Sequence, residues 1–341
     1  MRRPFISLMQ GGRDLIPVWG PLMESLVITD EKGMESDKLT VILDNRDGQC
    51  AFPEPGAMVS VSGGYVGEGG RVTGQFEVDQ VDFEGWPEKI TVYATTVSAK
   101  KATKERKTEA HKKEDTPTVG DLAKKIAKRN GWSPRIAPEI AKIPLEYEGQ
   151  AGEFDAQFLT RIVRRFGGIA AVKQGSLVVT KAGAGQSVSG RPLTPIRVAP
   201  GLNLISYRAS FKKRDDHDKA QAHTFDRKKV KRIDVDAGQG AITYRLREAF
   251  KSEAEAKKAA EAKLSDLKRG TGSATFEIEG DPDAAAECPV LPSGVPTKLA
   301  QRWNAIRVEH RFQDDKYVTS LECELPGQES ASGGSSASDS D

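Results

Sequence analysis

Apolar and polar residues alternate along most of the first hundred positions. The alternation is clearest in the segments that begin at Leu39, Met58, Gly74 and Lys89. A period of two is typical of strands with one buried face. Turn residues separate these segments, among them a glycine-rich stretch over 63–70. We therefore predict that residues 1–98 form a first small all-β domain, a β-barrel or a sandwich.

Residues 98–116 contain almost no apolar side chain and a dense mixture of both charges. Such a segment is expected to run over the surface as a linker or a solvated helix. It opens the middle part of the chain, over 99–190, whose pattern then changes from strands to helices.

A helix is predicted over 119–130, because Thr118 can serve as its N-cap and Gly131 as its end. A second helix is predicted over 153–166, where apolar residues recur at helical spacing. The segments IAAVK and SLVVTK then predict a hairpin that turns at 174–175. The linker and these elements together predict an α+β domain.

The β pattern returns after the Gly-, Ser- and Pro-rich loop at 183–200, in NLISYRASF, KRIDVD and AITYRL. A long helix follows, with Ser252 and Glu255 as a capping box and Gly270 at its C-terminal cap. Three more strands end near Pro326. Residues 191–326 are predicted to form a second β-barrel domain with a helix, and 327–341 a disordered tail.

Charge and cysteine content exclude several classes of partner. Lys and Arg number 51 against 49 Asp and Glu, so the formal net charge of +2 gives no argument for nucleic acid or acidic membrane as a partner. The three cysteines lie far apart, which predicts reduced thiols and no disulfide framework. No segment resembles a signal peptide or approaches about 20 consecutive apolar residues. We therefore expect the protein to be made in a cytoplasm and not to insert into a membrane.

Motifs for catalysis or ligand binding are missing. The glycine-rich stretch is not followed by Lys and Ser or Thr, the four histidines have no metal-ligand spacing, and no GxSxG elbow occurs. Two basic stretches, at 100–107 and 211–232, are interleaved with acids and lack stacking aromatics, so they are interpreted as solvated loops. We predict no catalytic, cofactor-binding or metal-binding residue, although spacing alone does not exclude a pair of catalytic carboxylates.

The most distinctive motifs lie between Phe276 and Pro326. A strand leads there to a Gly-Asp-Pro turn, a tryptophan opens a strand that ends in Val-x-His, and a Tyr-Val-Thr strand follows. With these motifs the segment resembles the C-terminal signature of the phage late control gene D family. The motif residues are Gly280, Asp281, Pro282, Trp303, His310, Tyr317 and Thr319.

The middle of the chain carries a second part of the resemblance. The segment that begins at Gly149 is similar to the family's helix with an acidic start and an internal Phe-Leu-x-Arg. One departure is that the family's Glu-Ser-Asp reads Glu153, Phe154 and Asp155 here. The resemblance extends over about 37–326, and the departure leaves the apolar face of the helix unchanged.

The resemblance implies a hub-like, mainly β fold with two small antiparallel β-barrels and an α+β domain in each chain. The implied function is that of a baseplate hub in a contractile phage tail or tail-like particle, similar to the N-terminal hub part of type VI secretion spike proteins. Such a hub is a virion structural protein and no enzyme. It forms a homotrimer that adapts the sixfold tail tube to the threefold spike.

Partners and location follow from the same resemblance. The implied partners are the tail spike, the tail tube, the tape-measure protein and other baseplate proteins, with DNA only in transit and no cofactor. The location is the tail baseplate of a virion or a tail-like particle, assembled in the cytoplasm of the host bacterium.

The motif residues have structural roles under this interpretation. Gly280, Asp281 and Pro282 form a turn, Trp303 supplies buried surface, and His310 packs or forms hydrogen bonds. The same roles would equally stabilise an isolated β domain. Two other functions stay open, a spike-associated cell-wall hydrolase and a nucleic-acid-binding late regulator.

Overall fold

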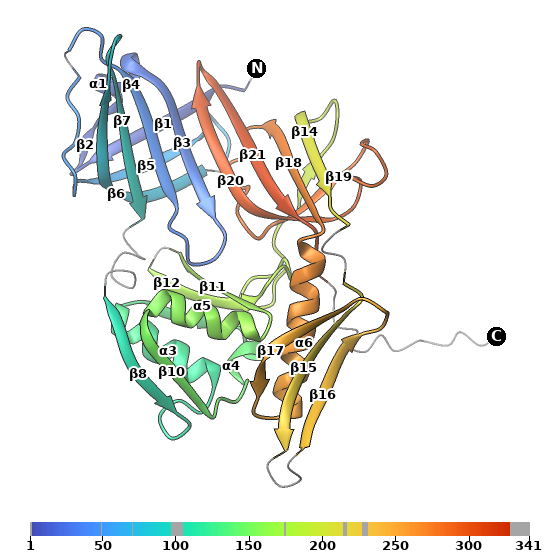
Figure 1. Cartoon of the computed structure of the whole chain (residues 1–341). Helices are drawn as coiled ribbons and strands as arrows, with labels where there is room; N and C mark the ends of the chain where they lie inside the picture. The colour runs from blue at the N-terminus through green and yellow to red at the C-terminus, as the bar shows by residue number, and fades with distance from the viewer. Residues whose placement is uncertain are drawn as a thin grey trace.

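The computed structural model describes residues 2–48, 50–69, 71–96, 105–173, 175–213, 217–226 and 231–327. A curled β region occupies the upper part of Figure 1, and an α+β unit and a helix with its own small sheet lie below it. The chain is therefore mainly β with an α+β middle, as the sequence predicts. Most of the predicted tail, after Gly327, lies outside the described residues.

One sheet of 13 strands joins the two β units, with the order β14-β18-β21-β20-β3-β4-β7-β6-β5-β1-β2 and with β13 and β19 beside this path. The join is the antiparallel pair of β20 and β3, which runs from Phe312 opposite Leu26 to Arg307 opposite Glu31. The strands of the first unit are β1 (Pro4–Gln10), β2 (Arg13–Asp14), β3 (Met23–Glu31), β4 (Lys38–Asp44), β5 (Met58–Tyr65), β6 (Arg71–Glu84) and β7 (Lys89–Thr96). Those of the second are β13 (Ile196–Val198), β14 (Leu204–Phe211), β18 (Gly272–Glu279), β19 (Pro289–Pro292), β20 (Trp303–Gln313) and β21 (Lys316–Glu324).

Each β unit buries a core of its own. The first core includes Trp19, Phe76 and Ile90, with Trp19 supplied by the short helix α1 (Ile16–Trp19), which a 3-10 turn, η1 (Gly20–Leu22), follows. The second core includes Phe276 and Trp303. The alternating pattern thus predicts both cores, whereas the sheet that connects them depends on strands far apart in the chain.

The middle unit packs three helices, one of them a single turn, against short sheets. Its helices are α3 (Val119–Asn130), α4 (Pro138–Ala141) and α5 (Asp155–Arg165), and its strands are β8 (Arg106–Lys112), β9 (Ser133–Ile136), β10 (Tyr147–Phe154), β11 (Gly168–Lys173) and β12 (Ser176–Lys181). The Thr118 hydroxyl accepts a hydrogen bond from Asp121 N at 3.1 Å, and Gly131 ends α3 at a φ of 74°. The predicted helix cap and the predicted β11–β12 hairpin are confirmed.

The prediction of a linker or solvated helix over 98–116 is wrong for 106–112. These residues form β8, which pairs antiparallel with β10. The inward side chains of β8 are polar, so the sequence lacks an apolar stripe there. Instead Glu109 bonds to Lys125 and Arg129 of α3, each at 2.7 Å, and His111 stacks on Phe158 with ring centroids 5.1 Å apart.

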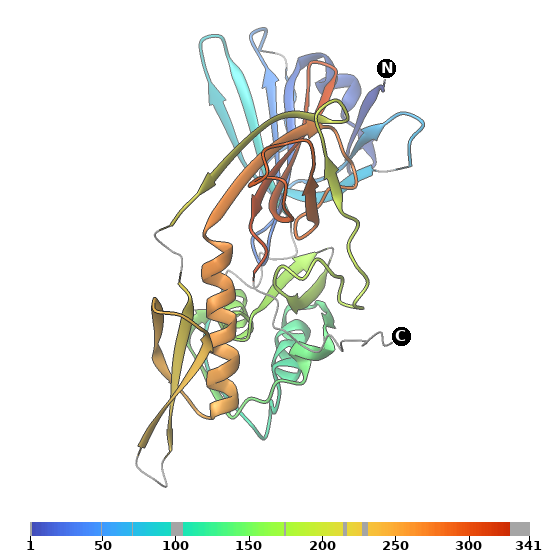
Figure 2. The same ribbon diagram turned by 90° about the vertical axis from the view of Figure 1, so that its right-hand side faces the viewer.

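The second correction concerns the strands between 219 and 250. They were predicted as part of the second barrel but form a separate sheet in the order β16-β15-β17, made of β15 (Lys219–Asp226), β16 (Lys231–Gly238) and β17 (Thr243–Phe250). The helix α6 (Glu253–Arg269) covers one face of this sheet through alanines such as Ala256 and Ala260. We call β15–β17 and α6 the outer unit, and Figure 2 shows it extending away from the large sheet.

The capping box predicted for α6 is confirmed in its first half. Ser252 Oγ accepts a hydrogen bond from Glu255 N at 3.2 Å. The carboxylate of Glu255 reaches back to the N–H of Lys251, also at 3.2 Å. This local signal fixes where the helix begins, because it satisfies N–H groups that have no partner within the helix.

Candidate assembly site at the junction of the β units

The Gly-Asp-Pro motif forms a turn directly after β18 and contacts β21. Gly280 N donates to Tyr317 O at 2.9 Å, and Asp281 N donates to Thr319 Oγ1 at 2.9 Å. A Cβ atom at Gly280 would lie 2.2 Å from the Tyr317 ring, closer than any real contact allows. Glycine is therefore required here by the approach of the tyrosine. Pro282 follows in the turn and is half-buried.

His310 and Tyr317 form a buried polar pair beside this turn. His310 Nδ1 lies 2.7 Å from the Tyr317 hydroxyl, and His310 Nε2 lies 3.2 Å from the carbonyl of Ala284. Because a carbonyl only accepts, the proton is on Nε2, and Nδ1 accepts from the tyrosine. Burial lowers the pKa of His310 to about 4, so the ring is neutral at physiological pH.

Tyr317 carries the motif to the first β unit. Its ring stacks on Phe312 with centroids 4.2 Å apart and lies 5.3 Å from Tyr65 of β5. Phe312 and Tyr317 belong to the core of the first β unit although both come from C-terminal strands. The motif residues around Tyr317 thus pack at the junction at which β20 pairs with β3.

Trp303 is the motif residue that lies apart from this junction. It is fully buried in the second core, where its indole N–H donates to Leu299 O at 2.9 Å. The rings of Phe211 and Phe276 lie 5.9 and 6.4 Å from it. The structure therefore divides the sequence motif into a junction cluster and a separate core anchor.

A lysine that the sequence did not single out joins the middle unit to the junction. Lys173 Nζ, at the end of β11, lies 2.5 Å from both Asp30 Oδ1 and Asp37 Oδ1 and donates to Glu31 O at 2.9 Å. The other oxygen of Asp30 accepts from Ala286 N at 2.8 Å. Burial raises the pKa of Asp37 to about 6, although the ammonium of Lys173 opposes this shift. No local sequence signal marks this cluster, because its members are far apart in the chain.

Lys173→Met is expected to lower the free energy of unfolding by about 1 to 3 kcal/mol, because two carboxylates lose their ammonium partner in a partly buried site. The side chain of Lys173 is 31% exposed, so solvent screening keeps the effect below that of a fully buried pair. Lys181→Met on the neighbouring strand β12 is the matched control, since Lys181 is exposed. Urea unfolding measures the free energy of unfolding of both variants. Equal losses would contradict the role of Lys173 as a link between the middle unit and the junction.

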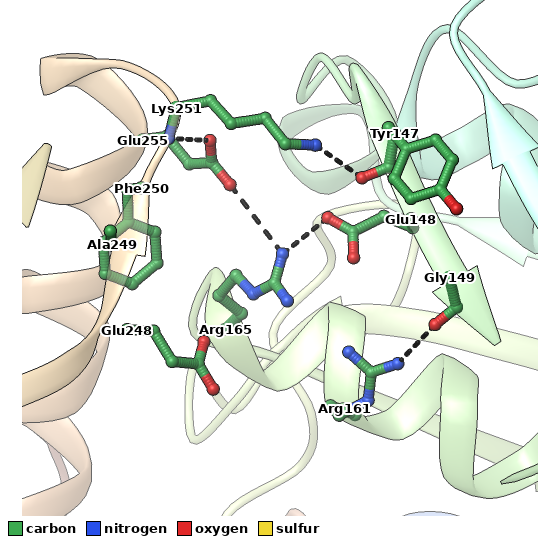
Figure 3. A pocket seen from close by; sticks show the side chains of 10 residues that line it. All are labelled: Tyr147, Glu148, Gly149, Arg161, Arg165, Glu248, Ala249, Phe250, Lys251 and Glu255. Atoms are coloured by element: carbon green, nitrogen blue, oxygen red, sulfur yellow. Dashed lines mark hydrogen bonds and ion pairs between the residues drawn. The ribbon is translucent and has the colours of Figure 1, made fainter. Parts of the chain in front are cut away.

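A second joint connects the middle unit to the outer unit, around a cavity of about 230 Å³ that Figure 3 shows. Arg165 Nη1 lies 2.6 Å from Glu148 Oε1 and 3.8 Å from Glu255 Oε1, and Lys251 Nζ donates to Tyr147 O at 2.5 Å. Arg161, on the same wall, is bonded to Glu153 and Gly149 O. The positively charged side chains around the cavity thus bind carboxylates and carbonyls of the chain itself, which indicates a structural joint.

The described residues offer no arrangement for metal or thiol chemistry. Among them no group of three or more His, Cys, Asp and Glu could hold a metal ion. The three cysteines are buried and unpaired, and burial raises the pKa of Cys288 to about 11, so its thiol stays protonated. In the same part of the chain no helix is long and apolar enough to cross a membrane.

Sequence comparison gives relatives over almost the whole chain. No family model matches. The probable baseplate hub proteins of Escherichia phages 186 and P2 are 27% and 28% identical to it, over 94% of this chain and 93% of each relative. The chain is similar over almost its whole length to these two phage baseplate hub proteins. Both relatives are named for a structural role, and the motif residues at the junction lie within the matched length.

Solved structures show that the fold is shared as well. The 43 kDa tail protein of prophage MuSo2 from Shewanella oneidensis has a TM-score of 0.69 at 16% identity, over 95% of this chain and 98% of that protein. An Escherichia coli component of the type VI secretion system has a TM-score of 0.59 at 10% identity, over 94% of this chain and 77% of that protein. The hub-like fold predicted from the sequence is confirmed.

Proposed function

We propose that the chain is a structural hub protein of a contractile phage tail or tail-like particle, which joins the tail tube to the spike without catalysing a reaction. The observation that carries this proposal is the full-length similarity to two baseplate hub proteins. Sequence similarity that extends through all units is more specific than the fold alone, because one fold can serve many functions.

The arrangement of the β units supports a threefold assembly. Each chain contributes two β units with separate cores, held side by side in one sheet. Three copies supply six such units, so a homotrimer could present near-sixfold symmetry to the tube and threefold symmetry to the spike. The partners proposed are the spike, the tube, the tape-measure protein and other baseplate proteins, with assembly in the host cytoplasm and DNA only in transit.

The purified chain is expected to form a trimer, alone or when produced together with the spike protein of its particle. Light scattering gives the molar mass of the complex. A chain that stays monomeric or dimeric at micromolar concentration and never binds the spike would contradict the proposal. The joints at Lys173 and Arg165 are internal to the chain, so variants there can serve to separate loss of folding from loss of assembly.

A further inference from the structure

Several strands of the large sheet have a free hydrogen-bonding edge, and two of these edges, on β14 and β6, lie at opposite sides of the β region (Figure 1). β14 lies at one end of the sheet and pairs there with β18. β6 pairs with β7 as far as Glu84 but with β5 only from Arg71 to Glu77. In the part of the chain that the structure describes, residues 80–84 of β6 therefore have a strand partner on one side alone. Unpaired edges of this kind favour pairing with another chain.

The core face of the sheet is uncovered at the β14 edge. Tyr207 lies opposite Phe276, which is fully buried in the second core, so both side chains are on the core face. Yet Tyr207 is 46% exposed and Phe211 is 45% exposed. Figure 2 shows β14 running across the side of the molecule that faces the viewer. An aromatic side chain that points to the core side and remains half exposed marks a place for further packing.

The same situation occurs at the free edge of β6. Phe83 lies opposite Ile90, which is fully buried in the first core. Phe83 is nevertheless 56% exposed, and its only covering ring is that of Phe52 among the described residues, edge-on with centroids 5.0 Å apart. Both free edges therefore carry aromatic residues on the core face that the chain itself leaves uncovered.

The outer faces of the two edges have opposite charge. On β14 the exposed Arg208 lies on the outer face, and Lys212 and Lys213 follow, also exposed. On β6, Asp82 and Glu84 lie on the outer face. Strands that pair edge to edge keep their faces, because side chains alternate with a period of two. An antiparallel register with Arg208 opposite Asp82 places Tyr207 opposite Phe83, so charges and aromatics match together.

We propose that β14 of one copy pairs with residues 80–84 of β6 of a second copy, and that this head-to-tail contact builds the trimer. The inference rests on the proposed function, because that function includes a ring that closes after three copies. The contact uses two different surfaces, so an open row of copies has one unpaired β14 edge and one unpaired β6 edge at its ends until the ring closes. Backbone pairing gives the affinity, while the opposite charges exclude β14–β14 and β6–β6 pairing.

Charge reversal on the full-length chain tests this contact. Arg208→Glu, or Asp82→Lys, is expected to weaken trimer formation at least tenfold in sedimentation experiments. Mixing the two variant chains does not close a ring of three, but a chain that carries both changes regains the trimer, because the reversed charges again lie opposite each other at every contact. Lys257→Glu with Lys258→Glu on the exposed face of α6 is the matched control and leaves the trimer unchanged.

A cysteine experiment covers the case in which reversed charges disturb folding. Ser210→Cys and Gln80→Cys are placed in separate chains, both at exposed positions, and the chains are mixed and treated with a bismaleimide cross-linker. We expect a cross-linked dimer in the mixture and not with either chain alone, since the three native cysteines are buried.

The outcomes separate this inference from the proposed function. A wild-type trimer that withstands both charge reversals and gives no cross-link overturns the strand contact and leaves the hub function standing. A wild-type chain that never associates, with or without the spike, overturns the trimer and the contact together. Loss of the trimer in each reversed variant and its return in the variant with both changes supports the contact.

Discussion

Replacing Trp303 by alanine is expected to lower the free energy of unfolding by about 3 to 5 kcal/mol, the usual cost of removing a large ring from a core. Trp303 is fully buried, packs near Phe211 and Phe276, and loses the hydrogen bond from its indole to Leu299 O when truncated. Urea unfolding followed by far-UV circular dichroism measures the loss. Assembly is expected to fail with folding, because β20 carries both Trp303 and the pairing with β3.

The matched control for Trp303 is the tryptophan at the β6–β7 turn. Trp86 is 87% exposed, so Trp86→Ala removes a ring of the same size with little loss of packing. Its effect on stability is expected to stay within about 0.5 kcal/mol, as for most surface substitutions. Similar losses for both variants would show that the second core does not depend on the Trp303 ring.

His310 is expected to make the protein less stable as the pH falls from about 6.5 to 4. Burial lowers its pKa to about 4 in the folded chain, whereas an unfolded histidine titrates near about 6.5. Between these values the unfolded state binds more protons, so stability rises with pH. The contribution is complete above about pH 6.5 and amounts to about 3 kcal/mol by linkage.

The measurement compares His310→Gln with the wild type at several pH values between 4 and 7. Glutamine does not titrate there, so its stability curve is expected to be flatter than that of the wild type. The raised pKa of Asp37, about 6, acts in the opposite direction but is present in both proteins, and the difference between the curves removes it. Parallel curves would show that burial does not hold His310 neutral in the folded chain.

Local signals in the sequence predicted the elements that depend on near neighbours. The caps at Thr118 and Ser252 each involve groups three residues apart, and the structure has both. The strand β8 was missed because its inward side chain Glu109 is held by ion pairs with α3 rather than by apolar contact. Period-two alternation of apolar residues detects a strand that packs through apolar side chains, and it does not detect one that packs through ion pairs.

The sequence did not predict contacts between strands and side chains that are far apart in the chain. The strands of the outer unit alternate like those of a barrel, and nothing in their residues states which sheet they join. The motif around Gly280 and His310 was found as a sequence, yet its contact with Tyr65 across the junction depends on the folded chain. No sequence pattern marks Lys173, Asp30 and Asp37, because single lysines and aspartates occur throughout the chain. Only the folded chain brings these three side chains into contact.

The pairing of β20 with β3 also sets the order of events during synthesis. β3 leaves the ribosome early, but the strand that completes its edge is among the last to emerge. A nascent chain therefore carries an incomplete sheet until translation is almost finished, and non-local pairing of this kind forms slowly. Chains cut short by premature termination before β20 would lack β20 and β21, so the edge of β3 would stay unpaired and the second core would stay incomplete.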